Sequence, residues 1–169
     1  MIFIITGTQV YPFDRVLRAV DELIERGVIT EEVFAQTGSS AYEPQHYAYE
    51  RFLNADVFRD WVNRADIVLT HGGTGAIVGA LKAGKRVVAV ARQASFGEHC
   101  DDHQLQIVRH FESTGFILVA RDMARLDETL QHAREFEPKA FQSNTQGIIR
   151  IIDDFIQTRE KARRGAGKG

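Results

Sequence analysis

The chain has 169 residues, of which 44% are hydrophobic and 26% are charged, an ordinary balance for one globular domain. The formal net charge is -2 and the sequence pI is near 6.3, so no global positive field indicates nucleic acid as a partner. Cys100 is the only cysteine, which excludes a disulfide framework and favours a reducing cytosol.

The spacing of apolar residues predicts alternating strands and helices along the chain. In the first half we expect strands at residues 2–5, 32–37 and 47–52, and helices at 13–26 and 56–64. In the second half we expect strands at 67–70, 86–90 and 116–119, and helices at 74–83, 101–113, 123–134 and 141–163. No run approaches the roughly 18 apolar residues that a membrane span needs.

This alternation predicts an α/β fold: a single Rossmann-like domain over residues 1–163 with a doubly wound parallel sheet, followed by a flexible tail at 164–169. The near-continuously apolar strands are typical of a parallel sheet covered on both faces. Ligands of such sheets bind beyond the carboxyl ends of the strands, where the glycine-containing turns fall.

The turn His71-Gly-Gly-Thr-Gly75 joins a predicted strand to a predicted helix. A helix N-terminus leaves backbone N–H groups unpaired and carries about half a positive charge, so it can bind an anion without a cationic side chain. Gly72, Gly73 and Gly75 lack the Cβ atoms that would hold a diphosphate off the backbone. With Thr74, these residues predict a phosphate site. The alternative is that the glycines only let the helix pack closely on the strand.

Two common nucleotide motifs do not match. The dinucleotide pattern needs a third glycine where Val78 stands. The segment from Gly79 to Lys85 imitates a P-loop, but Arg86 replaces the Ser or Thr that would hold magnesium. That segment also ends a predicted helix instead of opening one.

A second polar segment, residues 92–106, follows the predicted strand at 86–90 and leads into a helix. Its side chains offer many donors and acceptors that suit sugar hydroxyls. The candidates are Arg92, Gln93, Glu98, His99, Asp101, Asp102, His103 and Gln104. The alternative is a solvated loop in which Asp101 or Asp102 caps the next helix, and capping is compatible with binding.

We expect neither a metal nor another cofactor. His99 and His103 stand four residues apart and could hold zinc on a helix, but the Glu of the metalloprotease motif is absent. The chain has no Asp-x-Asp pair for a divalent cation on a nucleotide diphosphate. The charge of a leaving diphosphate would then fall to the helix N-terminus and to Arg92 or His71. No Gly-x-Ser-x-Gly motif is present, which argues against a hydrolase.

Several motifs together closely resemble the glycosyltransferase family 28 C-terminal domain, over residues 1 to about 120. They are Ile5-Thr-Gly-Thr-Gln9, His71-Gly-Gly-Thr-Gly75, Ala80-Leu-Lys-Ala-Gly-Lys85, Arg92-Gln93 and the run from Gly97 to Gln106. The chain is similar to single-domain members: the PssE-type exopolysaccharide transferase subunits and the catalytic subunit of the two-part UDP-N-acetylglucosamine transferase.

The resemblance implies the donor-binding half of a GT-B glycosyltransferase, with the acceptor-binding domain on a separate, membrane-attached partner. The Gly72 to Gly75 turn would face the diphosphate of a UDP-sugar, and His103 and Gln104 would hold the sugar. Thr8 and Gln9 would line the cleft facing the partner, and together with Gly7 they are candidate donor-binding residues.

One position departs from the family pattern. Several relatives carry a Glu that binds the ribose where this chain has Gly79. Ribose recognition must then come from elsewhere, and Glu98 is our candidate.

We therefore expect an inverting hexosyltransferase that moves GlcNAc, Gal or GlcA to a lipid-linked diphosphate saccharide in polysaccharide synthesis. It would be cytoplasmic and peripheral at the membrane through its partner. His99 is the candidate general base on this chain, unless the partner supplies the base. The alternatives are a noncatalytic nucleotide-sugar-binding or stabilising subunit, and a stand-alone nucleotide-binding or epimerase-like domain.

Overall fold

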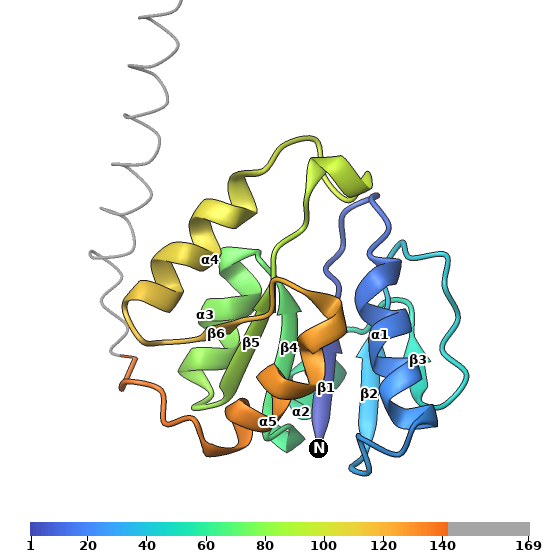
Figure 1. The fold of residues 1–169 in the computed structure, drawn as a ribbon, viewed down its shortest axis with the longest axis horizontal. Coiled ribbons are helices and arrows are strands. Elements are labelled where there is room, and N and C mark those ends of the chain that lie inside the picture. Colours follow the sequence, from blue (N-terminus) through green and yellow to red (C-terminus); the bar gives the residue numbers. More distant parts are fainter. Residues whose placement is uncertain (142–169) are drawn as a thin grey trace, which may run out of the picture.

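A parallel sheet of six strands forms the centre of the computed structural model, which describes residues 1–141 (Figure 1). The strand order is β3-β2-β1-β4-β5-β6, and every pairing is parallel. The strands are β1 (Ile2–Ile5), β2 (Val33–Gln36), β3 (Ala48–Glu50), β4 (Ile67–His71), β5 (Arg86–Val90) and β6 (Leu118–Val119). This order confirms the predicted Rossmann-like, doubly wound sheet, and its direction of winding reverses between β1 and β4.

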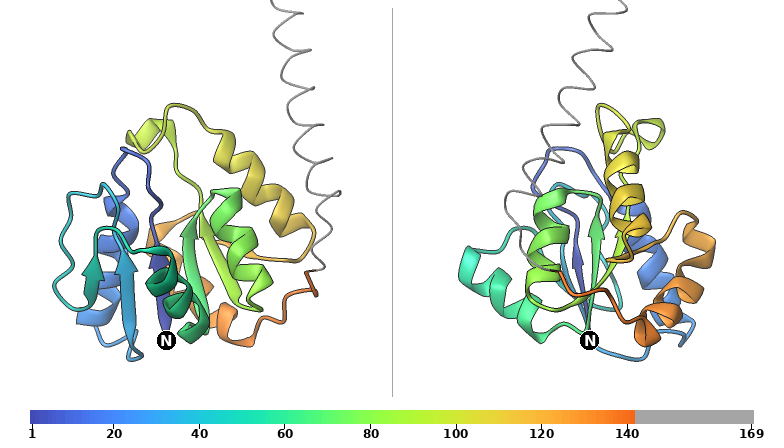
Figure 2. Two further views of the ribbon diagram at one scale, coloured as in Figure 1. Left: turned by 180° about the vertical axis from the view of Figure 1, so that it is seen from behind. Right: turned by 90° about the vertical axis from the view of Figure 1, so that its left-hand side faces the viewer.

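Helices cover both faces of the sheet (Figure 2). Alternate residues of β1 point to opposite faces: Ile4 packs in a cluster with side chains of α1 and α5, whereas Phe3 packs with side chains of α2, α3 and α4. The helices are α1 (Asp14–Glu25), α2 (Ala55–Arg64), α3 (Thr74–Lys82), α4 (His103–Ser113) and α5 (Leu126–Glu135), with short 3-10 turns η1 (Ala94–Phe96) and η2 (Met123–Arg125).

Several predicted boundaries move because of local hydrogen bonds. The helix predicted from residue 101 begins at His103, whose backbone N–H donates to the Asp101 side chain. The strand predicted at 116–119 begins only at Leu118, because the Phe116 N–H bonds back to the end of α4. The helix predicted at 123–134 starts with the 3-10 turn η2 before α5.

The predicted late helix at 141–163 and the tail at 164–169 lie outside the described residues, apart from residue 141. Within residues 1–141, no helix is both long enough and apolar enough to cross a membrane.

Candidate functional site

The predicted site residues come from three segments that follow β1, β4 and β5 at the carboxyl edge of the sheet. β1 and β4 pair in register, with Ile5 opposite Thr70, so the turns that follow them start side by side. The loop after β5 reaches the loop after β1 at the same end of the molecule (Figure 1). The strand order reverses between β1 and β4, and such a switch point is where open α/β sheets bind ligands.

The His71 imidazole sits between two glycines. Its Nδ1 lies 3.3 Å from the Ile5 carbonyl oxygen. A Cβ on Gly73 would come within 2.4 Å of the His71 Nε2, and a Cβ on Gly7 within 2.9 Å of the same atom. Gly7 also has a φ of +90°, which favours glycine. Both glycines are therefore required for the histidine to occupy this position.

Burial, together with the neighbouring Arg92 and His99, lowers the pKa of His71 to about 4, while the contact with the Ile5 carbonyl opposes the shift. His71 is therefore neutral near pH 7. A carbonyl oxygen only accepts hydrogen bonds, so the proton belongs on Nδ1 and the lone pair on Nε2.

The three glycines of the turn differ in why the structure requires a residue without a Cβ at each position. A Cβ on Gly72 would lie 2.9 Å from side-chain atoms of Gln104 and Val108 on α4. A Cβ on Gly73 would meet His71, as described above. A Cβ on Gly75, which is exposed, would meet no described atom within 4 Å. Internal packing therefore accounts for Gly72 and Gly73 but not for Gly75.

The N-terminus of α3 is not capped by a side chain. Its N-cap residue is Gly73, and the first backbone bond of the helix runs from the Ile77 N–H to the Gly73 carbonyl. The N–H groups of Thr74, Gly75 and Ala76 precede that bond, which is the arrangement that binds anions at helix N-termini.

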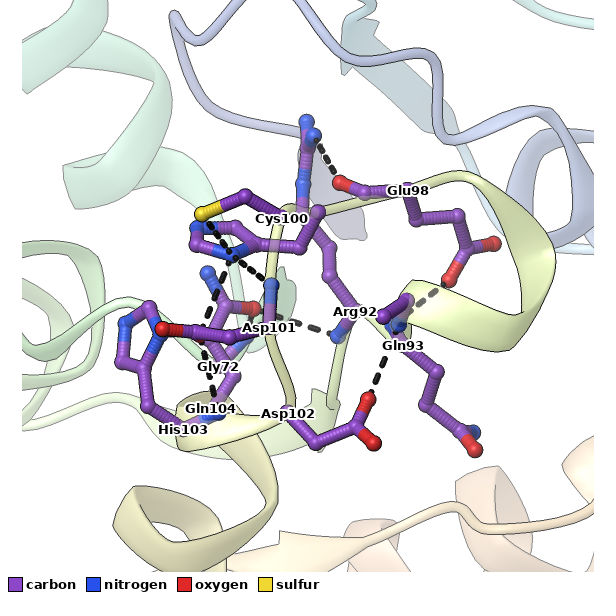
Figure 3. Close-up of polar contacts among 11 residues, drawn as sticks. Gly72, Arg92, Gln93, Glu98, Cys100, Asp101, Asp102, His103 and Gln104 are labelled. Carbon is purple, nitrogen blue, oxygen red and sulfur yellow. Dashed lines mark hydrogen bonds and ion pairs between the residues drawn. The ribbon is translucent and has the colours of Figure 1, made fainter.

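Gln104 joins the glycine turn to the strand beside it. Its side chain is buried, and its Oε1 accepts hydrogen bonds from the backbone N–H groups of Gly72 and Arg92, both at 3.1 Å (Figure 3). The predicted contact of Gln104 with a sugar remains a prediction. In the described structure, this side-chain oxygen positions the backbone of β4 and β5.

Arg92 is a buried cation beneath the same edge, with 1% of its surface exposed. Its guanidinium donates to the carbonyl oxygens of Thr6, Tyr11 and Glu98 at 2.5, 2.9 and 3.0 Å. Its Nε has no hydrogen-bond partner among the described residues. Arg92 therefore ties the loop after β1 to the loop after β5, where neutral carbonyls accept its hydrogen bonds and the Glu98 carboxylate interacts with its charge.

The Glu98 carboxylate is also bonded within the protein. Oε1 accepts from the Arg15 Nε at 2.7 Å, and Oε2 accepts from Arg15 Nη2 and from the Gln93 backbone N–H at 3.1 Å each. Because both oxygens are engaged, binding of ribose by Glu98 would require this ion pair to rearrange.

His99 is buried as well, with 5% of its side chain exposed. Its Nδ1 accepts from the Asp101 backbone N–H at 3.2 Å, and its Nε2 has no hydrogen-bond partner in the described part of the chain. Asp102 is exposed, and its Oδ1 accepts from the Ala94 N–H instead of capping α4. The remaining candidates are Thr8 and Gln9, which are exposed, and Thr74, Gln93 and His103, which are partly buried.

Two residues of this edge have roles that the sequence did not indicate. Arg15 lies in the first turn of α1 and reaches Glu98 across 83 positions of sequence. Asp101 was considered only as a helix cap or a sugar ligand, yet its carboxylate also contacts the rings of His99 and His103. The Arg15–Glu98 contact has no local signal because it depends on the packing of separate segments. The Asp101 contacts are local, but they depend on an irregular turn that has no periodic pattern in the sequence.

Residues 1–158 match the family model of the glycosyltransferase family 28 C-terminal domain. The chain belongs to this family. The family match extends the resemblance that the sequence motifs indicated from about residue 120 to residue 158.

Two curated relatives of this family 28 chain are named UDP-N-acetylglucosamine transferase subunit ALG13. The protein from Candida glabrata is 29% identical over 90 residues, which are 51% of this chain and 43% of the relative. The protein from Yarrowia lipolytica is 29% identical over 98 residues, which are 56% of this chain and 48% of the relative. The matched segments thus span less than half of either relative.

The crystal structure of Acinetobacter baumannii MurG has the same fold over part of its length. The family 28 chain aligns to it with a TM-score of 0.57 and 16% identity, over 90% of this chain and 49% of MurG. The prediction of a Rossmann-like half of a GT-B glycosyltransferase is confirmed at the level of the fold.

Proposed function

We propose that this chain is the donor-binding catalytic subunit of a two-part inverting glycosyltransferase. It would transfer a hexose (GlcNAc, Gal or GlcA) from a UDP-sugar to a lipid-linked diphosphate saccharide, with a membrane-attached partner binding the acceptor. The family match and the names of the two relatives support glycosyl transfer and favour UDP-N-acetylglucosamine as the donor. A role in polysaccharide synthesis belongs to the same proposal.

The observation that carries this proposal is the uncapped N-terminus of α3 at the switch point of the sheet. In an inverting transfer, the acceptor hydroxyl attacks the anomeric carbon and the bond to the UDP oxygen breaks. Negative charge then develops on the diphosphate. Prearranged N–H groups at Thr74, Gly75 and Ala76 would stabilise that charge, each by roughly 3 kcal/mol where such donors have been removed from other enzymes.

Two side chains would support the N–H groups. Arg92 is a buried cation that carbonyl oxygens surround, and a nearby anion would complement its charge. His71 lies beside the turn, and an anion against its Nε2 would favour the protonated ring, which donates a hydrogen bond. With these groups present, we propose that the transfer needs no divalent metal at the diphosphate.

The general base is best assigned to the partner. The His99 side chain is buried and its Nδ1 already accepts a hydrogen bond. His71 has a pKa of about 4, which is far below the value near the working pH that an efficient base requires. We therefore expect a carboxylate or a neutral histidine side chain of the acceptor-binding subunit to take the acceptor proton.

A noncatalytic nucleotide-sugar-binding subunit is the second candidate. It is favoured by the internal bonds of Arg92, Glu98 and Gln104, because polar side chains that hold the loops together do not by themselves require catalysis. The two candidates differ in one outcome. A chain that binds UDP-sugar and its partner, but transfers no radiolabelled sugar to a lipid diphosphate, would be the noncatalytic subunit.

The site is tested by calorimetric titration of UDP and of the three UDP-sugars, using a matched pair of variants. Gly75 and Lys82 both lie on α3 and are exposed, and an added Cβ at Gly75 meets no described atom within 4 Å. Gly75→Val should weaken UDP binding at least tenfold because its side chain obstructs the uncapped turn. Lys82→Val, at the other end of the helix, should bind UDP like the natural chain. Equal affinities for all three proteins would refute the proposed diphosphate site.

A further inference from the structure

Three metal-ligating side chains converge in the segment between β5 and α4. The Nδ1 of His99 lies 3.3 Å from Oδ1 of Asp101, and Nδ1 of His103 contacts the same oxygen. One ligand atom from each residue falls within 4.8 Å of the other two. Figure 3 shows the Asp101 carboxylate beside the His103 ring. We propose that His99, Asp101 and His103 form a binding site for a single zinc ion.

The donor set suits zinc. Zinc binds imidazole nitrogen and carboxylate oxygen at about 2.0 to 2.2 Å, usually with tetrahedral geometry. Neighbouring ligand atoms of such a tetrahedron lie about 3.3 to 3.5 Å apart. The separation between the His99 Nδ1 and the Asp101 Oδ1, 3.3 Å, has this value, whereas the His103 Nδ1 lies closer to the same oxygen and would move away from it when zinc binds. Three protein ligands would leave one position for water or another small ligand.

The Nδ1 of His99 is the ring nitrogen that faces the Asp101 carboxylate. It accepts a hydrogen bond from the Asp101 backbone N–H, so it is unprotonated, as a metal ligand must be. Zinc would have to replace that hydrogen bond, because the nitrogen has only one lone pair. The proton then belongs on Nε2, which is buried and has no hydrogen-bond acceptor among the described residues.

The three ligands do not depend on the helical spacing that the sequence suggested. His99 precedes α4, Asp101 lies in the loop, and His103 is the first residue of the helix. A turn of the chain, and not one helix face, brings the two rings to a centroid distance of 4.6 Å with an angle of 70° between them. The missing glutamate of the metalloprotease motif therefore says nothing about this site.

Zinc at this position would fix the start of α4, where the next residue is Gln104. The Gln104 side chain holds the backbone N–H groups of Gly72 and Arg92. The ion would thus stabilise the geometry of the glycine turn from a distance. It would have a structural role, distinct from the neutralisation of a diphosphate, so the proposal goes beyond the function proposed above and does not depend on it.

The test is calorimetric titration of zinc chloride into the full-length, untagged chain after removal of metal with a chelator. We expect one ion per chain and a rise in melting temperature. Asp101→Asn and His103→Gln should each weaken zinc binding at least tenfold, because each removes one of three ligands. The matched control is Asp102→Asn, since the Asp102 carboxylate bonds to Ala94 and lies outside the cluster. It should bind zinc like the natural chain.

A second control addresses Cys100, whose Sγ lies 3.5 Å from the His99 Nδ1. Cys100→Ser should retain zinc binding. Loss of binding in Cys100→Ser as complete as in Asp101→Asn would overturn the three-residue site, because the thiol would then be the main ligand. Absence of stoichiometric binding to the natural chain would also overturn it, as would an equal loss in Asp102→Asn.

A spectroscopic measurement covers the case in which a variant fails to fold. In the natural chain, zinc should shift the imidazole NMR signals of His99 and His103 and leave those of His46 and His110 unchanged. Shifts confined to the latter pair would refute the site without any variant.

Discussion

The turn after β4 and the loop after β5 lie at the same edge of the sheet, but they are built by opposite means. The turn is shaped by absent side chains: Gly72 makes room for α4, and Gly73 makes room for His71. The loop is shaped by buried polar side chains that bond to backbone and to one another, among them Arg92 and Glu98. A donor at this edge would therefore meet mainly backbone N–H groups, whereas much of the polar side-chain chemistry serves the protein itself.

This difference teaches a general point about polar loops. Residues 92–104 contain Arg, Gln, Ser, Glu, Asp and His side chains that can bond to sugar hydroxyls, and a sequence can only show that they are present. Burial decides which of them a ligand could reach. Gln104 and Arg92 are almost fully buried, while Asp102 is exposed and His103 is partly exposed. The variants below test whether the turn and the loop have the separate roles assigned to them.

The largest effect is expected from Gln104→Leu. The substitution leaves the buried N–H groups of Gly72 and Arg92 without their acceptor, and each unsatisfied donor costs on the order of 1 to 3 kcal/mol. We expect the free energy of unfolding, measured by urea denaturation, to fall by about 4 kcal/mol. Gln106→Leu, at an exposed position of the same helix, is the control and should change it by less than about 0.5 kcal/mol. Similar losses in both variants would mean that the hydrogen bonds of Gln104 to Gly72 and Arg92 contribute little to stability.

The next largest effect is expected from His71→Gln, which should change how stability depends on pH. The unfolded chain binds this proton near pH 6.5, the folded protein only near pH 4. Stability therefore falls as pH drops from 6.5 to 4, and the His71 contribution amounts to about 3 kcal/mol. His71→Gln should remove that part of the pH dependence when unfolding is followed over this interval. A variant whose stability changes with pH as steeply as that of the natural chain would contradict the buried, neutral histidine.

A smaller loss is expected from Gly73→Ala. The new methyl group would lie 2.4 Å from the His71 Nε2, and the ring has little room because Gly7 flanks it on the other side. We expect a decrease of about 2 kcal/mol in the free energy of unfolding, the usual effect of overpacking. Thermal melts of Gly73→Ala and Gly79→Ala provide the comparison, since an added Cβ at Gly79 meets no described atom within 4 Å. If Gly73→Ala proved as stable as Gly79→Ala, the packing role of Gly73 would be wrong.

The smallest effect on stability is expected from Gly75→Ala, and its sign is opposite. Alanine is favoured over glycine inside a helix by up to about 1 kcal/mol, so Gly75→Ala should stabilise the fold by roughly 0.5 kcal/mol. The same variant should weaken UDP binding several-fold. Gly79→Ala should also stabilise the fold, and Lys82→Ala, at the exposed far end of α3, should leave the affinity for UDP unchanged. An unchanged affinity in Gly75→Ala would place the diphosphate elsewhere.

Most of the fold could be predicted from the sequence, because its elements have strong local signals. The apolar runs at 2–5, 67–70 and 86–90 and the amphipathic helix after Phe13 agree with the structure to within a residue or two. The errors lie at ends that depend on single contacts, such as the His103 N–H on Asp101. A boundary that one side-chain hydrogen bond decides has no periodic signal in the sequence.

The candidate site divides in the same way. The position of the glycine turn between a strand and a helix, and hence of an unpaired helix N-terminus, followed from local pattern alone. The structural role of Gly72 and Gly73 could not be predicted from local pattern, because the atoms that exclude a Cβ come from His71 and from α4. The Arg15–Glu98 pair could not be predicted either, because the two residues meet only after α1 packs beside the loop that follows β5.

By itself, the sequence determined the order of strands and helices, the family resemblance and the segments that approach one another at the carboxyl edge. These depend on short-range periodicity and on motifs that the chain carries in continuous runs. Only the tertiary structure decided which polar side chains are buried and hold the loops together by hydrogen bonds, and which are exposed to a ligand. It also decided that His99, Asp101 and His103 face one another. The physical reason is that the burial of these side chains, and many of their hydrogen-bond partners, are set by neighbours distant in sequence. His99, Asp101 and His103 are close in sequence, but the turn that brings them together has no periodic signal.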